Sequence, residues 1–212
     1  MKISAIIFDV DGVLLDSNKL MIELHKIIAK KLGLRVPDDK EITSLWGKSF
    51  TELITSIWPH IDAKLFKNYV IDFIKKKKIV FPVVKGSKEI LKKLKKMRFK
   101  LGIVTGRPTD FTIDHMKNSG FDLKLFDAIV TGDDTKNHKP NPDPILRAVK
   151  LLKVKPEETV YVGDSLIDLE AARNAKVEFL GVLTGDVSKK EWKKNGVKSI
   201  IQSVADLENF LL

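Results

Sequence analysis

The chain has 212 residues, of which 43% are hydrophobic and 31% charged, a composition that supports a packed core and excludes a disordered chain. Lys and Arg total 38 against 28 Asp and Glu, and the formal net charge is +10. The absence of cysteine excludes disulfides, thiolate metal sites and a cysteine nucleophile. Because no apolar run is long enough to span a membrane and no signal-peptide pattern opens the chain, we expect a cytoplasmic protein without a membrane partner.

The excess positive charge admits three interpretations: a nucleic-acid or acidic partner, a lysine-rich thermophile-like surface, or an anionic substrate. Lysines gather at 75–78 and 92–96, in stretches whose apolar residues recur with a helical period. Such lysines usually form solvated helix faces. Because no aromatic interleaving or nucleic-acid motif accompanies them, we expect a thermophile-like surface and no nucleic-acid partner.

The first elements are one strand and a run of helices. Residues 3–8 form a continuous apolar run that stops at Asp9 and predicts a buried strand. Helical periodicity then predicts helices at 17–34, 38–46, 49–58 and 61–79. Asp16 and Ser17 supply an N-cap for the first of these helices. No strand pattern interrupts this segment.

From residue 86 onward, strands and helices alternate. Strands are predicted at 100–104, 128–130, 159–162, 178–183 and 198–201. Helices are predicted at 86–98, 108–119, 142–152, 165–175, 188–195 and 203–211. Strands separated by helices at this spacing indicate a parallel sheet covered on both faces. The helical segment 17–79 is therefore an insert that follows the first strand.

Polar residues follow four of the predicted strands. Asp9 and Asp11 follow the first strand, Thr105 follows the second, and Lys139 and Asp164 follow the next two. Because ligands of open parallel sheets bind beyond the carboxyl ends of the strands, we expect these residues to form one site. Asp9 and Asp164 can share one Mg²⁺, which prefers carboxylates and phosphate oxygens. Thr105 and Lys139 can hold the remaining phosphoryl oxygens.

The same residues supply the groups that phosphoryl transfer needs. The carboxylate of Asp9 can attack phosphorus, and Asp11 can protonate the leaving oxygen. Singly, each residue also has an ordinary explanation as a turn former, a helix cap or a solvated lysine. Their joint occurrence at four strand ends favours a functional site. Asp168, one turn beyond Asp164, either faces that site or is an exposed helix residue.

These segments resemble the four motifs of the haloacid dehalogenase-like hydrolase superfamily. The segments are DVDGVLLDS at 9–17, VTG at 104–106, KPNP at 139–142 and VGDSLID at 162–168. The insert resembles the cap of the subfamily that includes phosphoglycolate phosphatase and β-phosphoglucomutase. The resemblance implies an α/β fold with a Rossmann-like parallel-sheet core at 1–15 and 82–212 and an inserted all-helical cap domain at 16–81.

The resemblance also implies roles for the motif residues. Asp9 is the nucleophile, Asp11 the general acid and then base, and both contact Mg²⁺, Asp11 through its backbone carbonyl. Thr105 binds the phosphoryl group and Lys139 neutralises its charge. The metal ligands implied are Asp9, Asp11, Asp164 and Asp168. Asp168 is either a water-mediated ligand or a partner of Lys139.

Two features separate the reactions known in this superfamily. Dehalogenases and phosphonate-cleaving members lack the second carboxylate, which is present here as Asp11. The cap histidine of the mutases corresponds to Met21, and we expect His25, one turn further on, to be a surface or half-buried residue. A phosphatase acting on a small phosphorylated metabolite is therefore expected. A sugar-phosphate mutase and a catalytically inert, regulatory protein are the alternatives.

Substrate contacts are expected from the cap and from the second motif. Trp46, Gly47 and Lys48 lie at a break between two cap helices and are candidates for leaving-group contacts. Trp46 is equally well explained as a core aromatic of the cap. Gly106 and Arg107 follow Thr105, and Arg107 either binds a substrate anion or is an exposed turn residue. The architecture is compatible with a monomer or weak dimer.

Overall fold

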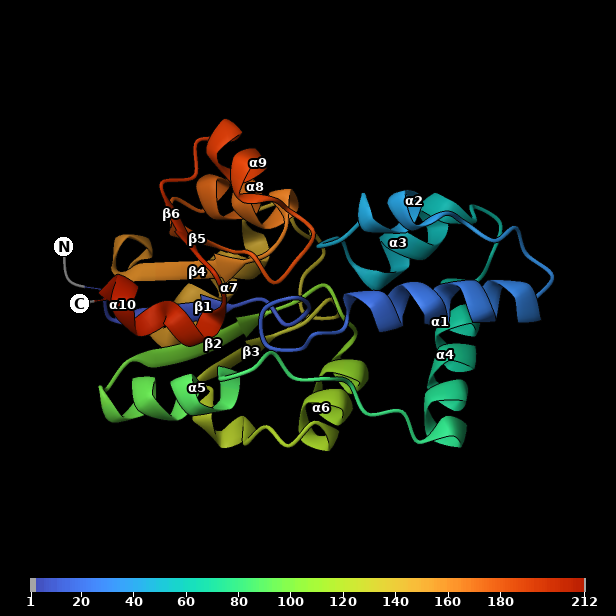
Figure 1. Cartoon of the computed structure of the whole chain (residues 1–212), viewed down its shortest axis with the longest axis horizontal. Helices are drawn as coiled ribbons and strands as arrows, with labels where there is room; N and C mark the ends of the chain where they lie inside the picture. Colours follow the sequence, from blue (N-terminus) through green and yellow to red (C-terminus); the bar gives the residue numbers. More distant parts are fainter. Residues whose placement is uncertain (1–2, 212) are drawn as a thin grey trace.

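The chain is built around one parallel six-stranded sheet. A computed structural model describes residues 3–211. The sheet has the order β3-β2-β1-β4-β5-β6 (Figure 1). Its strands are β1 (Ala5–Phe8), β2 (Lys100–Val104), β3 (Ala128–Val130), β4 (Thr159–Gly163), β5 (Glu178–Val182) and β6 (Ser199–Ile201). The order reverses direction between β1 and β4, and this topological switch point is where such sheets bind ligands.

Alternate residues of β1 face opposite sides of the sheet. Ile6 and Phe8 pack into one apolar cluster, while Ala5 and Ile7 pack into another, as the two-residue period of a strand requires. The helices are α5 (Ser87–Lys96), α6 (Thr109–Asn118) and α10 (Leu207–Leu211) on the first face, with α7 (Asp143–Leu152), α8 (Leu166–Asn174) and α9 (Lys189–Lys194) on the second. Both faces are therefore covered, as predicted.

Single-turn 3₁₀ segments account for small departures from the predicted elements. They are Leu123–Leu125, Pro156–Glu158 and Val204–Asp206. The last of them separates α10 from the start of the helix predicted at 203–211. The other predicted strands and helices of this region are present with shifts of one or two residues at their ends.

The insert between β1 and α5 is helical, as predicted. It contains α1 (Asn18–Lys31), α2 (Asp39–Thr43), α3 (Phe50–Ile57) and α4 (Ala63–Lys77). These helices stand beyond the end of the sheet at which β1 ends (Figure 1). The helix predicted at 38–46 stops at Thr43 because the following residues form turns that lead to Gly47, whose φ is +88°. The domain division at 16–81 stays a prediction, and the ends of the predicted core at residues 1, 2 and 212 lie outside the described residues.

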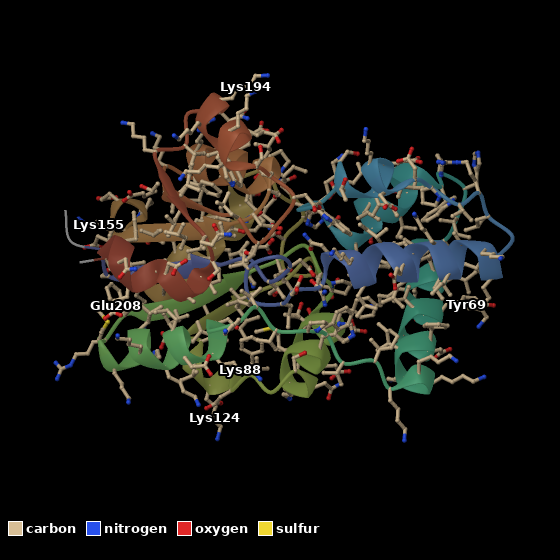
Figure 2. All side chains as sticks on the ribbon, in the orientation of Figure 1. Tyr69, Lys88, Lys124, Lys155, Lys194 and Glu208 are labelled. Atoms are coloured by element: carbon tan, nitrogen blue, oxygen red, sulfur yellow. The ribbon has the colours of Figure 1, made fainter. Side chains whose placement is uncertain are left out.

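The lysine-rich stretches lie on the surface. Residues 75–78 at the end of α4 are exposed, and the lysines of α5 are exposed except for the half-buried Lys88 and Lys95. Figure 2 shows Lys124, Lys155 and Lys194 extending outward from three other parts of the core. Leu91 and Leu94 on the opposite side of α5 are fully buried. The lysines therefore form solvated helix faces, as predicted. Over residues 3–211, no helix combines the length and apolarity that crossing a membrane requires.

Candidate active site

Two aspartates lie at the topological switch point of the sheet. Asp9 directly follows β1 and Asp164 directly follows β4, and these strands are hydrogen-bonded neighbours with Phe8 opposite Val162. The backbone N–H of Asp9 donates to the carbonyl of Val162 at 3.0 Å. Carboxylate oxygens of Asp9, Asp164 and Asp168 all lie within 4.8 Å of one another. The parallel register therefore brings together carboxylates that are far apart in the sequence.

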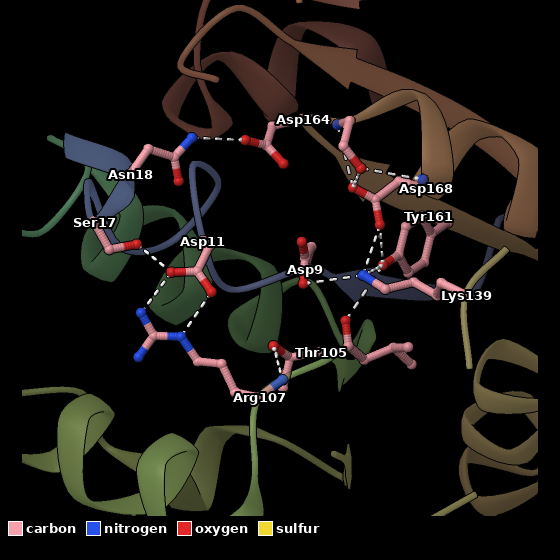
Figure 3. Close-up of polar contacts among 12 residues, drawn as sticks. Asp9, Asp11, Ser17, Asn18, Thr105, Arg107, Lys139, Tyr161, Asp164 and Asp168 are labelled. Atoms are coloured by element: carbon pink, nitrogen blue, oxygen red, sulfur yellow. Dashed lines mark hydrogen bonds and ion pairs between the residues drawn. The ribbon is translucent and has the colours of Figure 1, made fainter. Parts of the chain in front are cut away.

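The ammonium group of Lys139 lies inside this cluster. Its Nζ is 2.7 Å from Oδ1 of Asp168 and 3.3 Å from Oδ1 of Asp9 (Figure 3). It also donates to the hydroxyl of Tyr161 at 3.1 Å. Lys139 is only 3% exposed, so the alternative of a solvated loop lysine is wrong. Burial lowers the pKa of Lys139, but Asp168 and Asp9 outweigh burial and raise it, so that the lysine remains charged.

Asp168 has a second role at the start of α8. Ser165 is the N-cap residue, and its Oγ accepts a hydrogen bond from the backbone N–H of Asp168 at 3.2 Å. In return, Oδ2 of Asp168 accepts from the backbone N–H of Ser165 at 3.2 Å, which completes a capping box. Asp168 is fully buried. The alternative of an exposed helix residue is therefore wrong, while the ordinary explanation of Ser165 as a helix cap is correct.

The carboxylate cluster carries more negative charge than Lys139 neutralises. Burial raises the pKa of Asp9 to about 7, Lys139 opposes the rise, and Asp168 adds to it. Burial also raises the pKa of Asp164, with further contributions from Asp168 and Asp9. Crowded buried carboxylates take up protons unless a cation is close. A set of oxygen donors with excess negative charge fits a hard divalent cation such as Mg²⁺.

The carboxylate of Asp11 points away from this cluster and is held by Arg107 (Figure 3). Arg107 donates from Nε to Oδ2 at 2.6 Å and from Nη2 to Oδ1, and the hydroxyl of Ser17 also donates to Oδ1. Burial raises the pKa of Asp11, but Arg107 and Ser17 together outweigh burial and keep the pKa below its usual value. Asp11 is therefore an ionised carboxylate in this arrangement.

Two sequence predictions need correction here. Arg107 is 5% exposed, so it is not an exposed turn residue, and its guanidinium is engaged by Asp11. Nη1 donates to Nδ1 of His115 at 2.8 Å, and the guanidinium lies 4.9 Å from the centre of the Phe81 ring. Ser17 is the N-cap residue of α1, but its hydroxyl makes no capping hydrogen bond. It bonds to Asp11 instead.

A cavity of about 60 Å³ lies between the helical insert and the sheet. The core residues around it include Asp9, Asp11, Thr105, Gly106, Arg107 and Asp164. The insert contributes Asn18, Met21, His25, Trp46, Gly47, Lys48, Phe50 and Leu53. All five residues predicted to contact substrate therefore line this cavity. Thr105 is 4% exposed, and its Oγ1 accepts from the backbone N–H of Arg107 at 3.3 Å.

Glycines allow the insert and the core to approach closely beside this cavity. A Cβ on Gly106 would lie 2.1 Å from the carbonyl oxygen of Lys48, and a Cβ on Gly47 would lie 2.9 Å from Oγ of Ser165. The backbone N–H of Phe50 donates to the carbonyl of Gly106 at 3.0 Å. The sequence predicted substrate contacts for these glycines, and the structure adds a backbone contact between insert and core.

Trp46 forms a side-chain contact between the insert and the core. It is half-buried, and its Nε1 donates to Oδ2 of Asp186 in the loop after β5 at 3.1 Å. Trp46 is therefore not an interior aromatic residue of the insert.

The sequence reasoning missed several residues of the site. Tyr161 accepts from Lys139 and donates to Oδ1 of Asp168 at 3.0 Å, and Asn18 donates to Oδ2 of Asp164 at 3.3 Å. Tyr161 is a polar-tipped residue between the two valines of β4, a signal that could have identified it. His25 is 1% exposed, so the expectation of a surface or half-buried residue is wrong.

Two carboxylates lie at the ends of the central strands β1 and β4, and a helical insert that follows β1 lies next to them. This is the architecture of capped Rossmann-like hydrolases. A family model described as haloacid dehalogenase-like hydrolase matches residues 6–182. The chain belongs to the haloacid dehalogenase-like hydrolases, which makes it a hydrolase by family.

Two curated relatives and one solved structure illustrate the similarity. Pyrophosphatase PpaX of Halalkalibacterium halodurans is 33% identical, over 84% of this chain and 82% of the relative. Phosphorylated carbohydrates phosphatase of Thermotoga maritima is 31% identical, over 82% of each chain. The crystal structure of β-phosphoglucomutase from Clostridium difficile superposes with a TM-score of 0.80 at 24% identity, covering 97% of this chain and 93% of the other. The last comparison shows a shared fold.

Proposed function

We propose that the protein is a Mg²⁺-dependent phosphatase that hydrolyses a small phosphorylated metabolite through an aspartyl-phosphate intermediate. The observation that carries this proposal is the buried cluster of Asp9, Asp164 and Asp168 around the ammonium of Lys139. Relatives named as a pyrophosphatase and a phosphorylated carbohydrates phosphatase support the same chemistry. A cytoplasmic location and a monomeric or weakly dimeric state stay predictions from the sequence.

The proposed metal ligands are Asp9 and Asp164 through their carboxylates and Asp11 through its backbone carbonyl. When bound, Mg²⁺ supplies Lewis-acid neutralisation of phosphoryl charge. Asp168 contacts Lys139 directly, which supports the role of a partner that positions this lysine. Its burial beside Asp9 also agrees with a water-mediated contact to the metal.

The proposed reaction has two displacements. In the first, a carboxylate oxygen of Asp9 forms a bond to phosphorus while the bond from phosphorus to the leaving oxygen breaks. Asp11 gives its proton to that oxygen. In the second, Asp11 takes a proton from water, and the water oxygen displaces the carboxylate of Asp9 and releases phosphate. Thr105 and Lys139 hold the phosphoryl oxygens throughout.

The pairing of Asp11 with Arg107 adds a requirement to this scheme. A carboxylate held by a bidentate guanidinium is ionised and has no proton to give. Asp11 must therefore separate from Arg107 and bind a proton before the first displacement. The half-exposed position of the Asp11 side chain, at 30%, leaves room for that movement.

The test is release of inorganic phosphate from p-nitrophenyl phosphate with Mg²⁺ and with EDTA. We expect Mg²⁺-dependent turnover in the wild type and none in Asp9→Asn, which keeps the shape of the side chain but removes the nucleophile. Equal rates in the two proteins would contradict the proposal. Conversion of a sugar phosphate to its isomer, dependent on a bisphosphate and without release of phosphate, would identify a mutase instead.

A further inference from the structure

His25 is a buried titratable residue that the proposed reaction does not use. It lies on α1, is 1% exposed, and lines the same cavity as Asp9 and Asp11. Its Nε2 is buried and has no hydrogen-bond partner among the described residues. Buried polar atoms in native proteins are nearly always paired, so an unpaired atom beside a cavity calls for an explanation.

The chemical state of the imidazole follows from its other nitrogen. Nδ1 lies 2.6 Å from the backbone carbonyl oxygen of Met21. Because a carbonyl oxygen can only accept, Nδ1 carries the proton. Burial lowers the pKa of His25 to about 4, so the ring carries a single proton at neutral pH. Nε2 therefore presents a bare lone pair on the side of the ring away from the Met21 carbonyl.

Aromatic neighbours fix the position of this lone pair. The His25 ring stacks on Phe66 with centroids 5.9 Å apart, and Trp46 and Phe50 flank it at 6.5 and 6.2 Å. Trp46 and Phe50 line the cavity, whereas Phe66 contacts the imidazole and is not part of the cavity lining. The side of the cavity that His25, Trp46 and Phe50 form is thus aromatic, and Nε2 is a polar atom of this side without a partner among the described residues.

Among the described residues that line the cavity, three are carboxylates (Asp9, Asp11 and Asp164), and Lys48 is left as the cation for an anionic leaving group. Among the described residues that line it, the cations are Lys48 and Arg107, and Arg107 is already bound by Asp11. The second phosphate of pyrophosphate would bring oxygen acceptors toward an apolar surface and a bare lone pair. A hydroxyl group instead offers the donor that Nε2 lacks.

We propose that Nε2 of His25 accepts a hydrogen bond from a hydroxyl of the leaving group and thereby selects phosphate monoesters of polyols and sugars over pyrophosphate. This inference rests on the proposed phosphatase function, because it concerns the leaving group of that reaction. His25 acts on specificity and takes no part in the two displacements.

The experiment compares substrates that differ only in hydroxyl groups. The pairs are glycerol 3-phosphate with propyl phosphate, and glucitol 6-phosphate with hexyl phosphate. In at least one pair the wild-type kcat/KM for the polyol ester should exceed that for the alkyl ester about fivefold or more, the effect of one hydrogen bond to a buried acceptor. Pyrophosphate should be hydrolysed less efficiently than the preferred polyol ester.

Matched variants connect the preference to Nε2. His25→Asn keeps a side-chain N–H that can donate to the Met21 carbonyl but lacks an acceptor at the position of Nε2, so the polyol-to-alkyl ratio should fall to about one. His25→Gln has an amide oxygen that can reach that position and should restore part of the preference. Trp58 stacks on Phe66 with centroids 5.0 Å apart and does not line the cavity, so Trp58→Phe disturbs the same aromatic cluster at a distance from His25 and should leave the ratio unchanged. Thermal unfolding of each variant verifies folding.

Several results would overturn the inference. A wild-type ratio near one in both pairs would do so without any variant, as would pyrophosphate being the better substrate. A parallel loss on polyol and alkyl esters in His25→Asn would show a packing role only. If the wild type releases no phosphate even from p-nitrophenyl phosphate, the phosphatase function fails and this inference fails with it. Activity on p-nitrophenyl phosphate without polyol preference removes this inference alone.

Discussion

Replacing Gly106 by alanine should separate the insert from the core without unfolding either. Gly106 does not have a positive φ, so alanine is not strained there, but its Cβ would lie 2.1 Å from the carbonyl oxygen of Lys48 and 2.8 Å from its carbonyl carbon. An ordinary contact begins at 3.4 Å, so one backbone must retreat by about 1.3 Å. A misplacement of that size costs on the order of 100-fold in rate.

The assay is kcat/KM for p-nitrophenyl phosphate, with thermal unfolding measured in parallel. Gly33→Ala is the control, because a Cβ there meets no atom within 4 Å and only the φ of +67° is unfavourable. We expect Gly33→Ala to lose about 1–2 kcal/mol of stability and little activity, and Gly106→Ala to lose activity mainly. A loss smaller than tenfold in a folded Gly106→Ala protein would refute the reasoning that this approach positions the site.

Three further predictions follow from the charges of the site. In EDTA, the free energy of unfolding of the wild type relative to that of Asp9→Asn should fall as pH rises from about 4 to 7, because the folded state binds a proton on Asp9 more tightly than the unfolded state, with a pKa of about 7. Asp9 accounts for up to about 4 kcal/mol of this difference, which cancels the opposite pH dependence that the lowered pKa of His25 brings to both proteins. Urea unfolding measures this, and a flat profile would contradict it. Lys139→Met should cost about 3–5 kcal/mol at pH 8 by leaving buried carboxylates unpaired, with partial recovery at pH 5 where they are protonated. A pH-independent loss would argue against this cause. Arg107→Met should raise the pKa of Asp11 and increase the ratio of kcat/KM at pH 5.5 to that at pH 8; an unchanged pH profile would show that Asp11 does not carry the proton.

The strands and helices were predictable because each has its own periodicity. β1 is a continuous apolar run, β4 is a short run rich in β-branched and aromatic residues, and an aspartate directly follows each strand. The parallel arrangement followed from the alternation of strands with helices. The turns at 44–47 were not predicted, because the apolar residues there continue the helical pattern of α2 while the backbone turns toward Gly47.

The positions of the aspartates at the strand ends were predictable, but the side-chain contacts of the residues around them were not. Chain position places Asp9 and Asp164 at one edge of the sheet. It does not say that Arg107 turns toward Asp11, since this depends on the side-chain packing of Phe81 and His115. The burial of His25 likewise depends on aromatic residues from α3 and α4 that close over α1.

The two oxygens of Asp168 divide between folding and chemistry. Oδ2 closes the first turn of α8, and Oδ1 holds Lys139. A descendant of this chain that no longer needed catalysis would still lose half of the capping box of α8 if it lost this acid. Selection for stability alone therefore favours keeping Asp168, whereas Asp9, which closes no helix, is free to change once turnover no longer matters. In a related sequence, the acid after β1 is thus a better marker of activity than the acid in α8.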